Sequence, residues 1–257
     1  MRKALVLALV LASAAAVWAA ADGPRKMGTV KIVTPGLVVN LKGEPAKPGR
    51  KSNDVPIPPL KEVPLPEGTY DVGSLQLFTQ AVRKGKPEVW SLESAEELGK
   101  LKSFSVAAGG TTTLEGGPPL ALKIKAAVQE VDANDRPVRQ TWDNPTHPAV
   151  RVLFTFVGKA GEEYQPRPKR GKNAGPSPQV RILDGTGKVL HQGTYRSPMG
   201  EVGSTAEQYT IAAVPEGYCW RIPKDFKGRV RVEVVPEIGS LECKPPDPPV
   251  TVEIAGK

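Results

Sequence analysis

The sequence predicts an all-β protein with two consecutive antiparallel β-sandwich domains behind a signal peptide. Three features indicate this fold: short runs in which apolar and polar residues alternate, 27 prolines and 26 glycines that separate those runs, and an N-terminus typical of exported proteins. Alternation with a period of two is the pattern of a half-buried strand. Many short strands joined by turns are typical of β-sandwiches.

The N-terminus has the three parts of a secretory signal peptide. Arg2 and Lys3 precede an Ala/Leu/Val run, and the small residues Ala19–Ala21 stand before Asp22. The alternative is an uncleaved membrane anchor, because the apolar run is close to the shortest length that spans a bilayer. Its high alanine content and small-residue end favour cleavage after residues 1–21. We expect a secreted, periplasmic or cell-envelope protein that has no membrane span after cleavage.

The positive charge of the chain is concentrated near its N-terminus. The formal net charge is +8, and residues 22–51 hold seven Lys or Arg side chains against two acidic ones. A basic protein often binds nucleic acid or another polyanion. Here one proline-rich segment carries most of the excess, and an exported protein rarely meets nucleic acid. We therefore expect a solvated basic arm and no nucleic-acid partner.

Ten runs of alternating residues are predicted to be strands. They are residues 29–33, 74–78, 101–106, 111–114, 120–124, 150–156, 180–183, 209–213, 229–234 and 250–254. Residues 92–100 (LESAEELGK) form the one segment predicted to be a short helix, with a glycine near its end.

Two segments rich in Pro, Gly and Lys or Arg interrupt the strand pattern. Residues 43–59 and 164–178 are predicted to be long exposed loops or partly disordered arms. The second segment separates two predicted strands, so it is an insertion at one end of a sandwich. Long loops on a rigid β scaffold often carry binding function, and they also tolerate neutral change.

Two stretches of the first half carry a resemblance to known sandwich modules. Leu65–Val72 (LPEGTYDV) and Phe104–Leu114 (FSVAAGGTTTL) are similar to the LPxGTYxV and VxGxTT rhythm of carboxypeptidase-regulatory-like and transthyretin-like β-sandwich modules. Gly68 suits a tight turn, and Tyr70 suits the inward start of a strand. The resemblance implies such a sandwich over residues 22–127, with a role as a spacer, a protein-contact domain or a sugar-contact domain.

The second half, residues 128–257, resembles an immunoglobulin-like sandwich in general rhythm. A hairpin with Asp184 and Gly185 at its tip is predicted over residues 181–190. Trp220, in a predicted strand farther along, is a candidate core anchor. No more specific family is indicated for this half.

The two cysteines, Cys219 and Cys243, are the candidates for a disulfide bond. Export places them in an oxidising compartment, where an even number of cysteines favours pairing. A strand over residues 217–222 puts Cys219 on its outward face, from which it can reach a neighbouring segment. Pairing also needs a short Cα separation that the sequence does not supply, so both states stay open. With the distant His147 and His191, these cysteines do not have the ligand spacing of a zinc site.

The sequence lacks the motifs of common catalytic sites. It has no G-x-S-x-G elbow, no H-E-x-x-H helix and no phosphate-binding loop, since Gly185–Lys188 lacks the required spacing. His147 and His191 have no acidic partner nearby in sequence, so each is interpreted as a surface histidine. We predict that the protein is not an enzyme. The least favoured alternative is a hydrolase built from carboxylates that are distant in sequence.

Candidate ligand-binding residues lie in two predicted loops. Trp142 is followed by Asp143 and Asn144, and an exposed indole ring edged by polar groups is a typical sugar-binding platform. Tyr164 and Arg167 begin the second Pro-rich loop. The alternative, favoured by the aromatic content of only 5%, is that each tryptophan fills its own sandwich core.

A short polar cluster is the candidate metal site. Asp132, Asn134 and Asp135 resemble the D-x-N-D-x-P linker of cadherins, which implies calcium bound between consecutive sandwiches. The L-D-R-E companion sequence of cadherins is absent, and an arginine directly follows the cluster. The favoured alternative is the turn of a hairpin that begins with residues 127–131, capped by the Asp and Asn side chains. No cofactor other than calcium is expected.

Together these features predict an exported, non-catalytic binding or structural module. Its partner is predicted to be a protein or polysaccharide of the cell envelope, contacted through loops at the sandwich ends. The alternative is a carbohydrate-binding protein that uses Trp142. The sequence identifies neither the ligand nor the oligomeric state.

Overall fold

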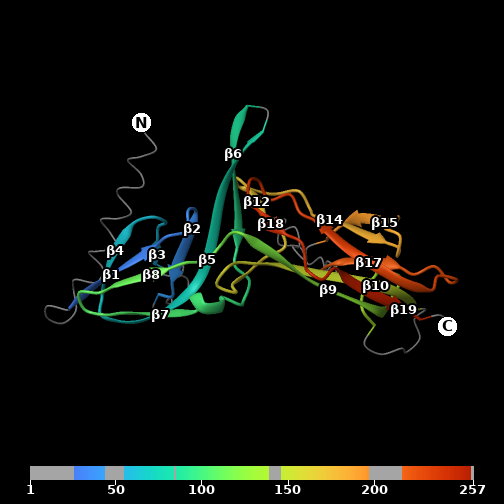
Figure 1. The fold of residues 1–257 in the computed structure, drawn as a ribbon, viewed down its shortest axis with the longest axis horizontal. Coiled ribbons are helices and arrows are strands. Elements are labelled where there is room, and N and C mark those ends of the chain that lie inside the picture. Colours follow the sequence, from blue (N-terminus) through green and yellow to red (C-terminus); the bar gives the residue numbers. More distant parts are fainter. Residues whose placement is uncertain (1–25, 44–54, 84, 139–145, 197–215, 256–257) are drawn as a thin grey trace, which may run out of the picture.

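The computed structural model describes residues 26–43, 55–83, 85–138, 146–196 and 216–255 (Figure 1). Within these ranges the chain is all-β, as predicted, and its single helical turn is the 3₁₀ helix η1 (Gly99–Leu101). No helix of the described residues is long and apolar enough to cross a membrane. The predicted signal peptide and the predicted strand 209–213 lie outside the described residues.

The first half of the chain supplies all of one sheet and most strands of a second, to which the second half adds β12 and β13. In the smaller sheet, central β1 is antiparallel to β4 and parallel to β8, in the order β4-β1-β8. The larger sheet has the order β13-β12-β6-β5-β2-β3, and β7 pairs with the first part of β5. The bounds are β1 (Met27–Ile32), β2 (Leu37–Leu41), β3 (Val55–Ile57), β4 (Glu62–Pro66), β5 (Gly68–Arg83), β6 (Lys86–Glu93), β7 (Ser103–Val106), β8 (Thr111–Leu114), β12 (Lys169–Arg170) and β13 (Asn173–Ala174).

The second half supplies the other two sheets. One has the order β11-β10-β9-β18, with β16 also pairing with β10, and the other has the order β15-β14-β17-β19. The bounds are β9 (Leu120–Val131), β10 (His147–Val157), β11 (Glu163–Tyr164), β14 (Gln179–Leu183), β15 (Val189–Thr194), β16 (Tyr218–Arg221), β17 (Gly228–Val235), β18 (Cys243–Lys244) and β19 (Val250–Ile254).

Alternation along the strands builds the core. In β1, Val30 and Ile32 are fully buried while Lys31 between them is only partly buried, and β2 repeats the pattern with Leu37 and Val39. Successive side chains of a strand point to opposite faces, so each strand contributes one apolar row. The buried residues form one contiguous cluster that extends through both halves of the chain.

The two halves share a sheet rather than meeting only at a linker. The short strands β12 and β13 follow β10 in sequence, yet β12 pairs with β6 of the first half through Lys169 with Ser91 and Arg170 with Trp90. The domain boundary expected between residues 127 and 128 falls inside β9, which continues without a break from Leu120 to Val131. The division into two domains stays a prediction.

The expected helix over residues 92–100 is wrong except for its last turn. Leu92 and Glu93 belong to β6, and the Oγ atom of Ser94 accepts a hydrogen bond of 2.9 Å from the backbone N–H of Leu75. The backbone N–H of Ala95 donates to Glu163 O at 2.8 Å. Pairing with other segments therefore takes up the backbone groups that a helix would have used, and tertiary contacts override local propensity.

The second Pro-rich segment is docked on the protein at its start, so the expectation of an exposed loop is wrong there and confirmed only for residues 171–174. Tyr164 is fully buried where β11 pairs with Phe156 of β10, and Pro166 and Pro168 are buried as well. Of the first Pro-rich segment, residues 44–54 lie outside the described residues. Its end forms β3, where Ile57 is fully buried against β2.

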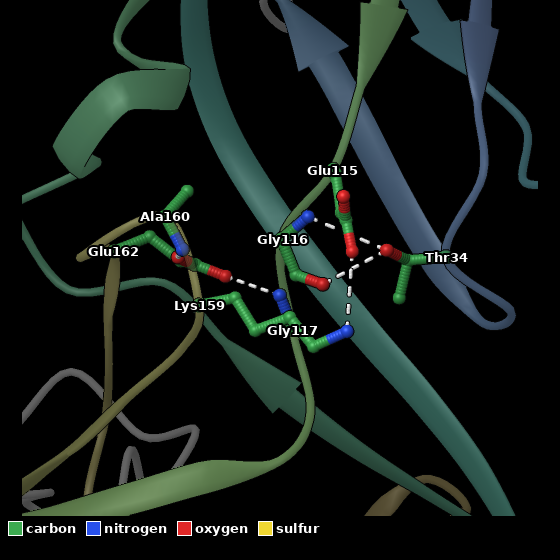
Figure 2. Close-up of polar contacts among 7 residues, drawn as sticks. All are labelled: Thr34, Glu115, Gly116, Gly117, Lys159, Ala160 and Glu162. Carbon is green, nitrogen blue, oxygen red and sulfur yellow. Dashed lines mark hydrogen bonds and ion pairs between the residues drawn. The ribbon is translucent and has the colours of Figure 1, made fainter.

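A buried glutamate lies where the two halves meet (Figure 2). Glu162 is fully buried, and its Oε2 atom accepts a hydrogen bond of 2.9 Å from the backbone N–H of Ala160. Its Oε1 atom accepts a hydrogen bond from the backbone N–H of Gly117. The same atom accepts one of 3.1 Å from the Tyr164 hydroxyl. Gly117 belongs to the segment that leaves the first half, so one carboxylate ties that segment to the 158–164 loop of the second half.

Glycines make room for this carboxylate. A Cβ atom at Gly158 would lie 2.1 Å from Glu162 Oε1, and one at Gly116 would lie 2.7 Å from the same atom. Gly99 has a φ of +54°, and a Cβ there would lie 2.3 Å from Ala160 O. The backbone of three separate segments can therefore approach Glu162 only because these positions lack side chains.

We expect Glu162→Gln to lower the free energy of unfolding by about 2–3 kcal/mol, because an amide nitrogen replaces an acceptor that faces buried N–H donors. Urea denaturation measures the change. The matched control is Glu115→Gln, whose carboxylate makes an exposed ion pair of 3.1 Å with Lys159. The control is expected to change stability by no more than about 0.5 kcal/mol. Equal midpoints for Glu162→Gln and the native protein would show that this carboxylate does not stabilise the junction.

Candidate functional site

A cleft of about 1120 Å³ lies between the segment that follows β6 and the insertion that carries β11, β12 and β13. Its walls come from segments of the chain that are far apart in sequence. Its lining residues are Gly73, Glu93–Leu98, Thr155, Glu163, Gln165–Lys169, Lys172–Ala174 and Glu216.

Backbone hydrogen bonds hold the two main walls at a fixed separation. Gln165 N–H donates to Glu93 O, and Glu163 N–H donates to Glu97 O, both at 2.8 Å. Farther along the insertion, Gly171 N–H donates to Val89 O at 2.8 Å. These bonds extend the pairing of β12 with β6, so the cleft is a preformed feature of the sheet edge rather than a gap between mobile loops.

Charged groups of both signs line the cleft. Lys169 Nζ lies 2.5 Å from Glu93 Oε1, and Lys123 Nζ lies 2.6 Å from Glu163 Oε1. The Glu163 carboxylate also raises the pKa of Lys123, first through this hydrogen bond and then through its charge. Two of the cleft carboxylates are thus neutralised by lysines, which leaves other ionic groups of the lining for a ligand.

Arg167, a cation of the cleft lining, has a buried nitrogen atom without a hydrogen-bond partner among the described residues. This atom is Nε of the guanidinium group. Lys172, Glu96 and Glu97 also line the cleft, and none of them makes an ion pair within the described part of the chain. Charged side chains of both signs that lack ion-pair partners are the kind of lining that suits a polar ligand with carboxylate or carbonyl oxygens.

The residues predicted to bind a ligand do not all lie in the cleft. Arg167 lines the cleft, as a binding role requires. Tyr164 does not, because it is a fully buried core residue whose hydroxyl donates to Glu162, and burial raises its pKa far above the usual range. Trp142, Asp143 and Asn144 lie outside the described residues.

Several cleft residues were missed by sequence reasoning. Glu96 and Glu97 were placed on a predicted helix, and Lys169 and Lys172 in a predicted loop, so nothing suggested that they meet. The one available signal was the pair of oppositely charged stretches, at residues 93–97 and 167–172. Their contact depends on the pairing of β12 with β6, which has no local sequence pattern.

The polar cluster at residues 132–135 forms a turn. Asp132 Oδ1 accepts backbone hydrogen bonds from Asn134 at 2.7 Å and from Arg136 at 2.9 Å. These bonds, the one from Arg136 first, lower the pKa of Asp132. Asp135 Oδ1 accepts from Arg221 Nε at 2.9 Å. Both carboxylates therefore have protein partners, and among the described residues no group of three or more His, Cys, Asp or Glu side chains could hold a metal ion.

The two cysteines are free thiols in this structure, so the disulfide bond that was left open is not formed. Cys219 lies in β16 and Cys243 in β18, on opposite sides of β10 and β9. Three strand spacings amount to about 14 Å, which is well beyond the Cα separation of a disulfide. Burial raises the pKa of each thiol to about 11.

His147 and His191 occupy separate surroundings. His147 is exposed at the start of β10. His191 lies on β15, where its Nδ1 atom hydrogen-bonds the Tyr218 hydroxyl and its ring stacks on Trp220 with a centroid distance of 6.4 Å. His191 and Cys219 both line a smaller pocket of about 220 Å³. Burial raises the pKa of the Cys219 thiol, which is the opposite of the lowered pKa typical of a cysteine nucleophile.

We expect Asp132→Ala to lower the midpoint of thermal unfolding by the same amount in millimolar calcium as in EDTA, because the lost hydrogen bonds belong to the turn. The pKa of Asp132 is lowered in the folded state, so its stabilising effect is present near neutral pH and is lost as the pH falls through that pKa. Differential scanning calorimetry measures both effects. A midpoint that calcium raises in the native protein but not in Asp132→Ala would instead establish a calcium site.

We expect the native protein to incorporate two thiol labels under denaturing, non-reducing conditions, because neither cysteine is paired. In the folded protein at about pH 8, a pKa of about 11 reduces the thiolate fraction, so labelling is expected to be about a hundredfold slower than in urea. Mass spectrometry of alkylated protein follows both. Absence of labelling in urea without reductant would demonstrate a disulfide.

No protein-family model matches this chain, and comparisons with curated proteins and with solved structures find no match. The resemblances to carboxypeptidase-regulatory-like, transthyretin-like and immunoglobulin-like modules therefore stay predictions.

Proposed function

We propose that the protein is an exported, non-catalytic binding module that receives a segment of a partner protein in the cleft beside β12. The observation that carries the proposal is the cleft lining, in which Arg167, Lys172, Glu96 and Glu97 have no ion-pair partner among the described residues. A peptide segment offers carbonyl oxygens and charged side chains of both signs, which match these groups.

Preorganisation supports a binding role. The walls are joined by backbone hydrogen bonds of 2.8 Å, so little ordering is required when a ligand enters. A site that is already formed loses less conformational entropy on binding, and more of the contact energy appears as affinity.

The aromatic residues favour a peptide over a polysaccharide. Sugar-binding sandwiches use exposed aromatic rings as flat platforms. No aromatic side chain lines the cleft in the described part of the chain, and Trp90 and Trp220 are buried. Trp142, the ring on which the carbohydrate alternative depends, lies outside the described residues.

Two features of the polar groups support a non-catalytic role. Glu93 and Glu163 are held in short ion pairs with lysines, an arrangement suited to fixing a wall. The thiol of Cys219 has a pKa raised by burial to about 11, and His191 is engaged by Tyr218. These groups are arranged for structure rather than for proton transfer or nucleophilic attack.

We expect the double variant Arg167→Glu/Lys172→Glu to bind its partner about tenfold more weakly, because it reverses the free cations of the lining. A photo-crosslinking amino acid at Asn173, an exposed residue of the lining, reports the partner in the exporting cell. The matched control is Lys61→Glu, a charge reversal at an exposed position outside the cleft.

Three results would contradict the proposal. Crosslinks that are equally strong in the double variant would place the interface elsewhere. Capture of envelope polysaccharide instead of protein, lost in Trp142→Ala, would favour the carbohydrate alternative. Turnover of glycosidic, ester or peptide substrates that is abolished by Glu96→Gln or Glu97→Gln would identify an enzyme.

A further inference from the structure

Strands β15 and β16 meet at one residue pair and then diverge into different sheets. The N–H of Arg196 donates to Gly217 O at 3.0 Å, and the N–H of Gly217 donates to Arg196 O at 2.8 Å. From this pair β15 continues along β14, and β16 continues along β10. A pocket of about 220 Å³, lined by Thr194 of β15 and Cys219 of β16 among others, lies in the angle between the two strands. We call it the β15–β16 pocket.

The β15 wall directs backbone groups into the pocket. Along an antiparallel strand, successive residues direct their N–H and C=O groups to opposite sides. Tyr195 N–H donates to the carbonyl of Pro178, the residue before β14, at 2.8 Å, whereas Arg196 is bonded to the β16 side. Thr194 therefore directs its N–H and C=O groups away from β14, as Arg196 does, and into the pocket.

The β16 wall has the same property. Ile222 N–H donates to Pro148 O at 2.9 Å on the β10 side, so Cys219, three residues earlier, directs its backbone groups to the opposite side. Thr194 and Cys219 are the positions at which a continued β15–β16 ladder would form its next hydrogen-bonded pair. No hydrogen bond joins these two residues in the part of the chain that the structure describes. Two N–H donors and two carbonyl acceptors therefore face the pocket.

Tyr218 spans the angle between the strands and forms the buried side of the pocket. Its ring belongs to β16, yet a Cβ atom on Gly193 of β15 would lie 2.7 Å from that ring. Its hydroxyl hydrogen-bonds the Nδ1 atom of His191, also on β15. The side chain is buried, so packing within the protein holds the two walls in place.

Arg151 brings positive charge to the end of the pocket that the Arg196–Gly217 pair closes. A Cβ atom on Gly217 would lie 3.8 Å from Arg151 Nε, which places the guanidinium group at that end. Arg151 Nη2 donates to the backbone oxygen of Glu216 at 3.0 Å. Arg151 makes no ion pair with any described residue.

Arg196 adds a second cation to the same lining. Its side chain is 63% exposed, and Nη1 lies 4.0 Å from Asp135 Oδ2. The other oxygen of that carboxylate accepts a hydrogen bond of 2.9 Å from Arg221 Nε, so Arg221 already provides the close counter-charge of Asp135. A ligand carboxylate at the closed end would therefore meet two guanidinium groups, which are strong partners for carboxylates.

The end of a polypeptide has the groups that match this pocket. It offers peptide N–H and C=O groups for the two walls and a terminal carboxylate for the arginines. The interior of a chain does not fit, because the Arg196–Gly217 pair blocks a path onward between the strands. The Glu216 carboxylate also lines the pocket, but its Oε1 atom accepts from the Tyr195 hydroxyl at 3.3 Å.

We propose that the β15–β16 pocket binds the C-terminal end of a partner polypeptide. The terminal carboxylate lies against Arg151 and Arg196, and the last peptide groups pair with the backbone of Thr194 and Cys219. This site goes beyond the cleft beside β12, with which its lining shares only Glu216.

The test is a titration of the purified, ¹⁵N-labelled exported protein with three probes, followed by NMR shifts of the Thr194 and Cys219 backbone amides. The probes are N-acetyl-trialanine with a free carboxylate, the same peptide as its C-terminal amide, and acetate. The free acid is expected to shift both amides and to bind about tenfold more tightly than either other probe, because only it offers both the carboxylate and the peptide groups.

Arg151→Gln and Arg196→Gln are each expected to weaken binding of the free acid about tenfold and to leave the amide probe unchanged. Arg196 is exposed, so its replacement tests the charge even if Arg151→Gln lowers stability. The matched control is Arg229→Gln, which removes an arginine that is 71% exposed and ion-paired with Glu253 on another strand. The control is expected to bind all three probes like the native protein.

Four outcomes would overturn the proposal. Absence of binding by the free acid at millimolar concentration would do so, and so would equal affinity for the acid and the amide. Equal affinity for acetate and the free acid would identify a site for a bare carboxylate instead of a chain end. Binding that is lost in Arg167→Glu/Lys172→Glu but retained in Arg151→Gln would place the peptide in the cleft. Because the shifts are read at Thr194 and Cys219, failure here leaves the cleft proposal standing, and failed crosslinking from the cleft leaves this one standing.

Discussion

The carboxylate of Glu162 is fully buried, and its hydrogen bonds among the described residues come from backbone amides and a tyrosine hydroxyl rather than from a cation. Removing such a group from water is costly unless its lone pairs are satisfied. The donors come from the segment before β9 and from the loop after β10, so the carboxylate is satisfied only when these segments meet. The hydrogen bonds of the buried Glu162 carboxylate therefore favour the observed placement of the two halves.

Other parts of the structure follow from this placement. Lys100 N–H donates to Ala160 O at 2.9 Å, and Lys159 N–H donates to Gly117 O at 3.0 Å, so the backbone beside Glu162 is shared between the halves. The insertion that follows Tyr164 then runs along β6 and forms the second wall of the cleft. The binding surface is therefore a product of the junction rather than of either half alone.

The all-β class and many strands could be predicted from the sequence, because a period of two is a local signal. The alternation in residues 150–156 and 229–234 corresponds to β10 and β17. The cleft could not be predicted, since it depends on β12, a strand of two residues that pairs with β6 far from it in sequence. Glu162 was equally hidden: beside Glu163 in a polar stretch it resembles a surface residue, and only the surrounding glycines indicate its burial. The wrongly expected helix at residues 92–100 has the same origin, because long-range pairing took precedence over local propensity.

Because β12 of the second half pairs with β6, the sheet of the first half cannot be completed until the second half has been synthesised. Synthesis proceeds from the N-terminus, and the first half is finished long before β12 and Glu162 exist. Until then, β6 has an open edge and the N–H of Gly117 lacks its carboxylate. An unpaired edge on a nascent sheet is an opportunity for mispairing with other chains. A chain truncated before residue 169 would lack β12 and leave this edge of β6 without its partner.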